Sequence, residues 1–510
     1  MNLLDDPVFT IETSTGIELC TLPRIYALLS DDAVESFVKL QAHQKQAWHC
    51  FLAQLGAIAT EDRDLPATEA GWRNALAVLT VPEAWNLYTE DLSKPAFMQP
   101  PVPENTIDVF RDSKGQFQEV DVAEYDIPVL SKNHALKINR VQQPSPEHWV
   151  YMLANVQTAE SGWGRGKYPT SRMNGGYGTR AFFTTTPSLR LGEWIMYDIK
   201  RLHKYKSEVV SDEGYKESIH PLLWTIAWDG SKEEIDLEEL HPWYIDCCRR
   251  IRRIKKMWVH TGTKGTRVGG VINGQTGDPW IPVDNDDNKI LMPSRKTFRY
   301  DRLWKVLFDR SDYKAPFGFT DVGDGYVVCR TLIPNDTERE YNLERIMRFS
   351  ARESSNPFDN EFDSNDSKDE ISAVAWEAED RVQKASEAVS IFSQALGWLF
   401  CKDPDERKHN DILDTFKNAC NRQVNALHAR IDQRFFDRLF EAPDLDDEER
   451  LTFWETILVK ALRTQFNQAK ELCPNKHRWK RLAKAQSIFD NQMKSAFTYA
   501  NQYENESAYA

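Results

Sequence analysis

The segment SSNPFDNEFDSNDSKDE, residues 354 to 370, separates two parts of the sequence that have different patterns. It is polar and acidic and contains few large aliphatic side chains. Such a segment cannot bury enough apolar surface to offset the entropy lost on ordering. We therefore expect a linker here, with a domain boundary near residue 365. A chain of 510 residues is in any case too long for a single hydrophobic core.

Helical patterns dominate the sequence after this linker. They cover residues 370 to 400, 408 to 441, 446 to 472 and 476 to 502, and Pro404, Pro443 and Pro474 interrupt them. Four long helices with short connections are typical of an antiparallel bundle. We predict a four-helix bundle over residues 366–510.

The sequence before the linker mixes helical and strand patterns. KLQAHQKQAWHCFLAQLGAIA, residues 39 to 59, has the spacing of an amphipathic helix and follows a short β-rich opening. GGVINGQTGDPWIPV (269 to 283) and DGYVVCRTLI (324 to 333) indicate strands and hairpins. The predicted fold class is therefore α+β, with a large mixed N-terminal domain over residues 1–365 followed by the bundle.

Charge is distributed unevenly along the chain. The net charge of −14 disfavours a nucleic-acid partner, because phosphate binding needs local positive potential. However, residues 130 to 206 hold twelve Lys and Arg against four Asp and Glu, and residues 245 to 267 hold eight against one. Residues 354 to 380 hold nine acids and a single lysine. The two basic islands remain candidates for binding phosphate.

Metal and cofactor motifs are absent. The eight cysteines form no C-x-x-C pair, so we expect them to be reduced and buried, and the adjacent Cys247 and Cys248 to serve packing. Residues 359 to 370 place oxygen side chains as a calcium loop does, but Ser364 replaces the glycine of the sharp turn, which favours a solvated linker. His43 and His49 lie six apart in the predicted helix, on opposite faces, and we expect structural roles for them.

Catalytic and targeting motifs are absent too. The glycine clusters lack a Walker lysine, a G-x-S-x-G elbow and the features of a dinucleotide fold. The N-terminal MNLLDDPVFTIE lacks the bases of a signal peptide, and no run of about eighteen apolar residues occurs. We predict a cytoplasmic protein that is not an enzyme, carries no metal or other cofactor and does not bind a membrane.

Two glycine clusters lie in the first basic island: SGWGRG (161 to 166) and SRMNGGYGTR (171 to 180). A residue without Cβ lets main-chain amides approach base edges or phosphates closely. Surface loops also use glycine for turns, and these residues leave both interpretations open. The second island, RRIRRIKKMWVHTGTKGTR (249 to 267), is equally open between a solvated face and a phosphate-binding surface.

Several segments together resemble CasA, the large subunit of the type I-E CRISPR surveillance complex Cascade. They are MNLLDDP at the N-terminus, the predicted helix at 39 to 59, KPAFMQP (94 to 100), SKNHALK (131 to 137), SGWGRG followed by SRMNGG, NGQTGDPWIP (273 to 282) and the four C-terminal helices. The resemblance covers most of the chain. Its order and spacing are more specific than any one motif.

The resemblance implies a non-catalytic protein that reads the protospacer-adjacent motif (PAM), the short duplex beside a CRISPR target, from the minor groove. Its implied partners are the PAM duplex, the displaced single strand, the guide-RNA-bearing backbone and small subunits, and a helicase-nuclease or other nuclease. Carried over to this sequence, the PAM loop contains Gly162, Trp163, Gly164, Arg165 and Gly166, with Asn174, Gly175 and Gly176 close behind. Arg165 stands where the family has a third consecutive glycine, which implies an added contact to a narrow groove or to phosphate.

Three further features are carried over from the family. The lysine of its basic hairpin corresponds to Lys264, with Arg267 as the other candidate. A nucleic-acid-facing loop would contain Lys132, Asn133, His134 and Lys137, and a strand-separating wedge would contain Asn335, Asp336, Thr337 and Glu338. The wedge lacks the family's glutamine, and its acids would repel phosphate. The cysteine pairs of some relatives are missing as well, so zinc is not expected.

Two other functions stay open at this stage. A nuclease or nucleotide-using enzyme could bind magnesium through the acids at 359 to 370 or 284 to 287. A pure assembly scaffold could use its basic islands to bind an acidic protein and never touch DNA.

Overall fold

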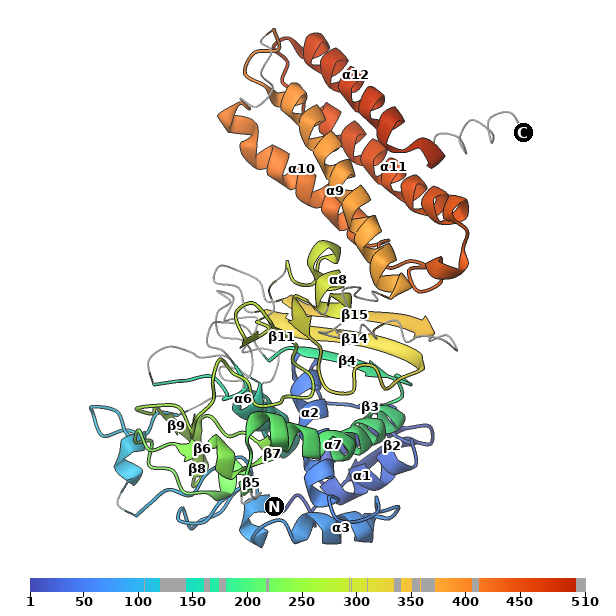
Figure 1. Ribbon diagram of the computed structural model, residues 1–510. Coiled ribbons are helices and arrows are strands. Elements are labelled where there is room, and N and C mark those ends of the chain that lie inside the picture. The colour runs from blue at the N-terminus through green and yellow to red at the C-terminus, as the bar shows by residue number, and fades with distance from the viewer. Residues whose placement is uncertain are drawn as a thin grey trace. The chain divides into compact units, whose positions relative to one another are not determined.

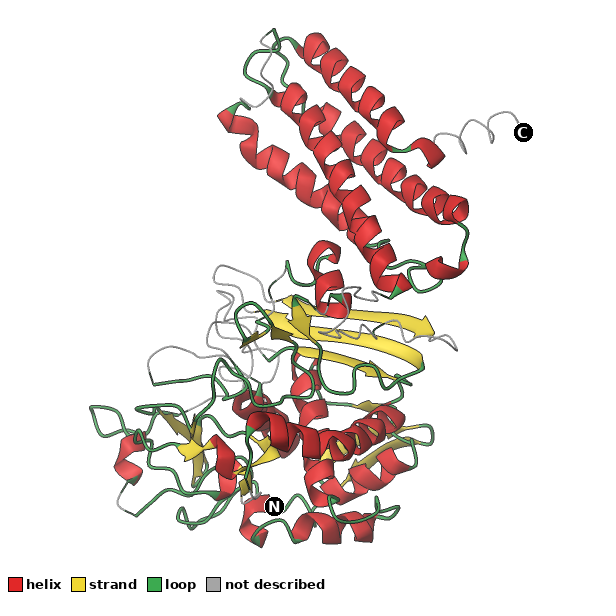
Figure 2. Ribbon diagram, in the orientation of Figure 1, coloured by secondary structure: helices red, strands yellow, loops and turns green. Residues whose placement is uncertain are grey.

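The computed structural model describes residues 1–104, 106–119, 144–159, 166–173, 180–216, 220–292, 294, 296–309, 311–333, 341–350, 358, 372–405 and 412–500. The chain forms two compact units. The mixed unit comprises Met1–Arg295 and Ser311–Ser350, and the helical unit comprises Lys296–Arg310 and Ala351–Ala510. Figures 1 and 2 show mixed helices and strands in the first and helices in the second, which confirms the predicted α+β class.

The mixed unit opens with a small sheet and is built around long helices. Strands β1 (Phe9–Thr13), β2 (Gly16–Cys20) and β3 (Ser36–Phe37) form an antiparallel sheet in the order β2-β1-β3. The helices of this unit are α1 (Leu22–Ser30), α2 (Lys45–Ala59), α3 (Glu69–Ala77), α6 (Pro146–Thr158) and α7 (Leu191–Glu213). The short β-rich opening predicted from the sequence is confirmed.

Helix α2 runs through the core of the mixed unit. Residues Gln46 to Ala59 are all buried, so the helix is not amphipathic as predicted. Gln54, for example, is hydrogen-bonded internally, because its Nε2 donates to the carbonyls of Trp243 and Tyr244 at 3.1 Å each. A polar residue in the pattern therefore marks a buried hydrogen bond here and not a solvent face.

A second antiparallel sheet has the order β15-β14-β4. Its strands are β4 (Phe182–Thr186), β14 (Asp324–Ile333) and β15 (Tyr341–Ser350), and they lie side by side in Figure 1. The strand predicted at 324 to 333 is confirmed. The expected wedge residues lie in the connection between β14 and β15, outside the described residues, where Ile333 pairs with Tyr341.

Shorter strands complete the mixed unit. The strands β5 (His220–Leu222) and β7 (Leu240–Ile245) are parallel, as are β6 (Ile235–Asp236) and β10 (Val268–Gly269), while β8 (Arg250–Ile254) and β9 (Met257–Thr261) form a hairpin. Strand β11 (Val283–Asp284) pairs with both β12 (Lys289–Ile290) and β13 (Tyr313–Lys314). The segment 269 to 283 is thus mostly loop, with strand only at its ends.

The helical unit is a bundle of α9 (Ala373–Phe400), α10 (Asp414–Asp432), α11 (Asp447–Glu471) and α12 (Arg478–Ala496). The four predicted helices are present. Helix α10 ends at Asp432, nine residues before the predicted limit of 441, and residues 433–440 form turns in which Arg438 has a positive φ of 52°. A fifth helix, α8 (Tyr300–Phe308), precedes the linker in the sequence but belongs to this unit. The predicted division into residues 1–365 and 366–510 would place α8 in the mixed unit, whereas Lys296–Arg310 belongs to the helical unit.

Two sequence-based expectations concern the whole chain. All eight cysteines are free and buried, as predicted. No helix among the described residues is long and apolar enough to span a bilayer.

Candidate nucleic-acid interface

The first glycine cluster and the second basic island meet in the structure. Gly166, the last residue of SGWGRG, accepts a hydrogen bond from the amide of Thr263, with an N–O distance of 2.9 Å. Gly166 has a φ of +78°, and a Cβ there would lie 3.2 Å from the carbonyl oxygen of Thr263. A Cβ on Gly262 would lie 3.2 Å from the carbonyl oxygen of Gly166. Glycine at both positions therefore permits the close main-chain contact.

Lys264 follows this contact directly. Its amide donates to the carbonyl of Gly230 at 2.9 Å, and its carbonyl accepts from the Tyr168 hydroxyl at 3.4 Å. The Lys264 side chain is exposed. The main chain of the predicted hairpin lysine is thus fixed beside the end of the glycine cluster, while its ammonium group stays in solvent.

The segment between the two glycine clusters is held by Asp246. Its Oδ2 accepts from the Thr170 hydroxyl at 2.6 Å and from the Ser171 amide at 2.7 Å. Asp246 is the only acid between residues 245 and 267, and it lies directly after β7. A single acid within a basic island was the sequence signal that could have identified this anchor.

The second glycine cluster is bracketed by two buried arginines. Arg172 Nη1 and Arg180 Nη2 both contact Asp278 Oδ2, at 3.5 and 2.5 Å. Arg172 also lies over the Tyr244 ring and Arg180 over the Trp280 ring. In the sequence these two arginines contribute to the charge of the first basic island, whereas in the structure they are buried and anchor both ends of the segment.

Most arginines of the second island are interior as well. Arg252 Nη1 donates to the carbonyl of Gln99 at 2.9 Å, and Arg252 Nη2 donates to that of Lys94 at 2.6 Å. Burial lowers the pKa of Arg250 and Arg252 to about 10. From the sequence, the second island was interpreted as either a solvated face or a phosphate-binding surface. Arg250 and Arg252 fit neither interpretation because they are buried. The exposed cations of the β8–β9 hairpin are Lys255 and Lys256 at its tip, and Lys264 lies after β9, outside the hairpin in which it was predicted.

Arg267 is buried in the same way. Its guanidinium lies 4.6 Å from the centre of the Trp228 ring, and Nη2 donates to the carbonyl of Ile226 at 2.9 Å. Burial lowers its pKa to about 10. A buried, hydrogen-bonded guanidinium is poorly placed to contact DNA, so Lys264 is the better of the two predicted hairpin cations.

The remaining predicted site residues lie outside the described residues. They are Gly162, Trp163, Gly164 and Arg165, Asn174, Gly175 and Gly176, Lys132, Asn133, His134 and Lys137, and the wedge residues Asn335, Asp336, Thr337 and Glu338. The calcium-loop pattern at 359 to 370 also lies outside them. Their roles stay predictions.

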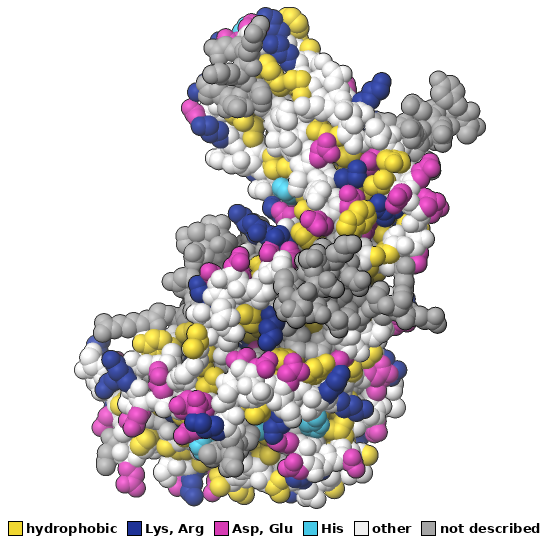
Figure 3. Space-filling model, viewed as in Figure 1, with side chains coloured by type: hydrophobic (Ala, Val, Ile, Leu, Met, Phe, Trp, Pro, Cys, Tyr) yellow, Lys and Arg dark blue, Asp and Glu magenta, His cyan; other side chains and the backbone are white. Residues whose placement is uncertain are grey.

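The described part of the chain contains no cluster of side chains that would form a metal site for the enzyme alternative. No group of three or more His, Cys, Asp or Glu there could hold a metal ion. His49 Nε2 contacts Asp198 Oδ2 at 2.7 Å with both side chains buried, which is consistent with the structural role expected for it. Figure 3 shows Lys and Arg interspersed with Asp and Glu on the visible described surface, without one broad positive patch.

Comparison with known proteins places this geometry in a known fold. No protein-family model matches the sequence, and no curated protein matches it. Solved structures do: Cse1 of Thermobifida fusca has a TM-score of 0.62 at 14% identity, covering 98% of each chain. The chain has the Cse1/CasA fold.

Further structures support the Cse1/CasA fold. CasA of Thermus thermophilus has a TM-score of 0.60 at 12% identity, covering 97% of this chain and 99% of its own. Cse1 of Acidimicrobium ferrooxidans has a TM-score of 0.58 at 12% identity, covering 98% of each chain. A chain described as part of a CRISPR RNA-guided surveillance complex has a TM-score of 0.52 at 9% identity. The resemblance inferred from the sequence is confirmed at the level of the fold.

Proposed function

We propose that this protein is the non-catalytic large subunit of a type I-E CRISPR surveillance complex and reads the PAM duplex from the minor groove. The main support is the contact between Gly166 and Thr263, which joins a glycine cluster to the turn that carries exposed Lys264. The Cse1/CasA fold provides the second support.

The chemistry of the minor groove suits this arrangement. Its edge presents mainly acceptors, with the guanine amino group as the one distinguishing donor. A main chain without Cβ atoms fits against a shallow edge, and a lysine donates to acceptors shared by several base pairs. Such a surface recognises a group of related motifs and discriminates poorly among them.

Anchoring of the loop ends would limit the entropic cost of binding. Asp246 holds the segment before Arg172, and Asp278 holds Arg172 and Arg180. A loop with fixed ends loses less conformational freedom when it meets DNA. We propose that these acids position the glycine segments without touching the duplex.

Opening of the duplex is the next proposed step. Once the guide pairs with the target, exchange of DNA pairs for RNA–DNA pairs is nearly balanced in free energy, so the protein has only to nucleate it. We assign this nucleation to the residues between β14 and β15, and support of the displaced strand and small subunits to the bundle. A recruited nuclease would act on the opened target.

A salt titration tests the proposed DNA contact. The guide-loaded complex is bound to a target duplex with randomised flanking bases, from which its preferred motif is selected. Changing Lys264 to Ala should weaken binding to that duplex roughly ten-fold and reduce the slope of log affinity against log salt by about 0.9, because one bound cation no longer releases a counterion from the DNA.

The matched control is Lys200→Ala, which removes an exposed lysine from α7 in the same unit. It should leave the affinity and the slope unchanged. Equal affinity and equal slope for Lys264→Ala and the unaltered chain would argue against a DNA contact and favour the scaffold alternative.

A further inference from the structure

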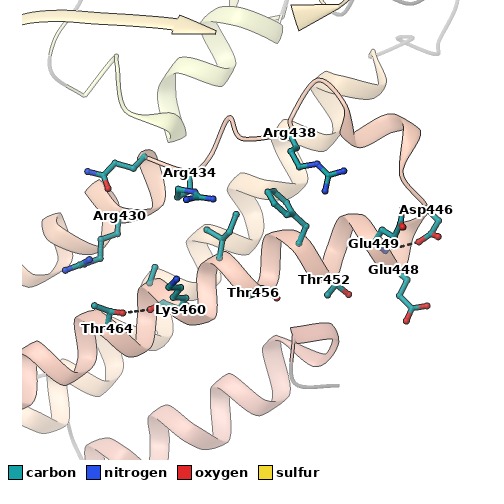
Figure 4. A pocket seen from close by; sticks show the side chains of 14 residues that line it. Arg430, Arg434, Arg438, Asp446, Glu448, Glu449, Thr452, Thr456, Lys460 and Thr464 are labelled. Carbon is teal, nitrogen blue, oxygen red and sulfur yellow. Dashed lines mark hydrogen bonds between the residues drawn. The ribbon is translucent and has the colours of Figure 1, made fainter. Parts of the chain in front are cut away.

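The helical unit contains a groove that the proposed DNA contact does not use. It lies between α11 and the end of α10 with its following turn, and has a volume of about 970 Å³. Figure 4 shows cationic side chains along one wall and threonines along the other. The residues that matter below are Arg430, Arg434, Arg438, Phe453, Ile457 and Lys460.

An apolar stripe forms the floor of this groove. Phe453, Ile457 and Ala461 are spaced four residues apart on α11 and therefore share one face of the helix. Phe453 and Ile457 are half-buried and Ala461 is buried. Short threonine side chains at 452 and 456 leave room above the stripe.

The walls of the groove carry opposite charges at its two ends. Arg430, Arg434 and Lys460 lie together at one end, and Asp446, Glu448 and Glu449 lie at the other (Figure 4). Arg438 lies between the two ends and pairs with Glu441 at 3.1 Å. Arg434 pairs with Asp437 at 2.6 Å, but the two side chains are 58% and 40% exposed. Exposed pairs of this kind contribute little and exchange readily for a partner's carboxylate.

This charge pattern discriminates between classes of partner. A nucleic-acid backbone needs positive potential along its whole path, and three carboxylates at one end oppose that. From Glu449 to Thr464 the groove follows α11 for roughly 22 Å at 1.5 Å per residue. An amphipathic helix of about four turns matches this length, the apolar floor and the two charged ends.

We propose that the groove receives an amphipathic helix from another protein subunit of the same assembly. The helix presents apolar side chains to Phe453 and Ile457, carboxylates to Arg430, Arg434 and Lys460, and basic side chains to the acidic end. Opposite charges at the two ends also fix the direction in which it lies. The inference rests on the proposed function only in placing the partner within a guide-RNA-bearing complex.

Site-specific photo-crosslinking in the assembled complex tests this inference. Benzoylphenylalanine replaces Thr456 on the groove wall, and in a control it replaces Arg422, which is exposed on α10 and does not line the groove. The expected result is a crosslink from position 456 alone to an amphipathic, acid-bearing helix of another subunit, mapped by peptide mass spectrometry. Crosslinks from 456 to nucleic acid, to this same chain or to nothing would each overturn the inference.

Charge reversal gives an independent measurement. Arg434→Glu combined with Lys460→Glu should weaken binding of the chain to the remaining complex roughly ten-fold, whereas Arg422→Glu should not change it. Circular dichroism and the thermal midpoint check that each variant keeps its helices. Unchanged binding of the folded double variant would contradict the inference.

The two proposals fail in distinguishable ways. If the chain never joins a guide-RNA-bearing complex, both are wrong. If it joins the complex and binds the target duplex, but position 456 gives no crosslink to a subunit helix, only the groove inference is wrong.

Discussion

At the scale of single residues, several arginines are buried and hydrogen-bonded inside the protein. Arg172, Arg180, Arg252 and Arg381 are among its largest fully buried side chains. Arg381, for example, donates to the carbonyls of Phe435 and Asp437 and pairs with Glu377 at 2.6 Å. A planar guanidinium with five donors can satisfy several carbonyls at once, so arginine can link segments inside a unit.

His241 illustrates how such burial couples stability to pH. Its Nδ1 accepts from the Trp243 amide at 3.0 Å and its Nε2 contacts Glu61 at 2.8 Å. Burial, together with the nearby cations Lys206 and Arg172, lowers its pKa from 6.5 to about 3. Below pH 6.5 the unfolded chain binds a proton that the folded chain does not, so stability falls as the pH falls.

We expect this histidine to remove about 2 kcal/mol from the free energy of unfolding between pH 6.5 and 5. His241→Asn keeps an acceptor near Nδ1 but cannot titrate. The loss on going from pH 7 to 5, measured by urea unfolding, should therefore be smaller in the variant by that amount. Equal losses in the two proteins would show that His241 does not control this part of the pH dependence.

At the scale of elements, the β8–β9 hairpin separates its cations by position. Arg250 and Arg252 are buried within β8, whereas Lys255 and Lys256 are exposed at the turn. Thr261 Oγ1 also donates to the carbonyl of Val109 at 2.6 Å, which ties β9 to a neighbouring segment. The hairpin is thus attached through its arginines and its strand end, and its lysines face solvent.

Two substitutions in this hairpin should have very different effects. Arg252→Ala leaves the carbonyls of Lys94 and Gln99 without their donor and opens a cavity, so we expect a loss of about 3 kcal/mol in the free energy of unfolding. Lys256→Ala should change it by less than about 0.5 kcal/mol. Urea unfolding of both variants checks this, and similar losses would contradict the assigned burial.

Local patterns were sufficient to predict some elements but not others. The bundle helices and strand β14 each have a clear local hydrophobic pattern, and the structure confirms these elements. The amphipathic interpretation of α2 was wrong because polar residues such as Gln54 and His49 bond internally. The contact between Gly166 and Thr263 joins residues distant in sequence, and a charge count cannot tell buried Arg252 from exposed Lys264.

At the scale of the whole molecule, the chain crosses between its two units more than once. Helix α8 precedes β14 and β15 in the sequence, yet it packs in the helical unit. The Tyr300 amide donates to Asp432 Oδ1 at 2.7 Å, and the Tyr300 ring lies 5.0 Å from that of Phe435. The bundle is therefore completed by a segment that a linear division would assign to the other domain.

This crossing predicts where a substitution in α8 should act. Tyr300 is 1% exposed, so Tyr300→Ala should destabilise the helical unit by about 3 kcal/mol through lost packing. Hydrogen exchange should then be faster at amides of α10 and unchanged in α2 of the mixed unit. Faster exchange in α2 with α10 unaffected would contradict the assignment of α8 to the bundle.

The central claim is that the end of the first glycine cluster and Lys264 together form one surface that faces duplex DNA. Its most direct test is crosslinking from position 264 in the guide-loaded complex bound to its target. A cysteine at 264, carrying a short photoreactive group, should crosslink to the base pairs beside the target, and the same group at position 200 should not. Crosslinks from 264 only to protein, in a complex that binds its target normally, would contradict the claim.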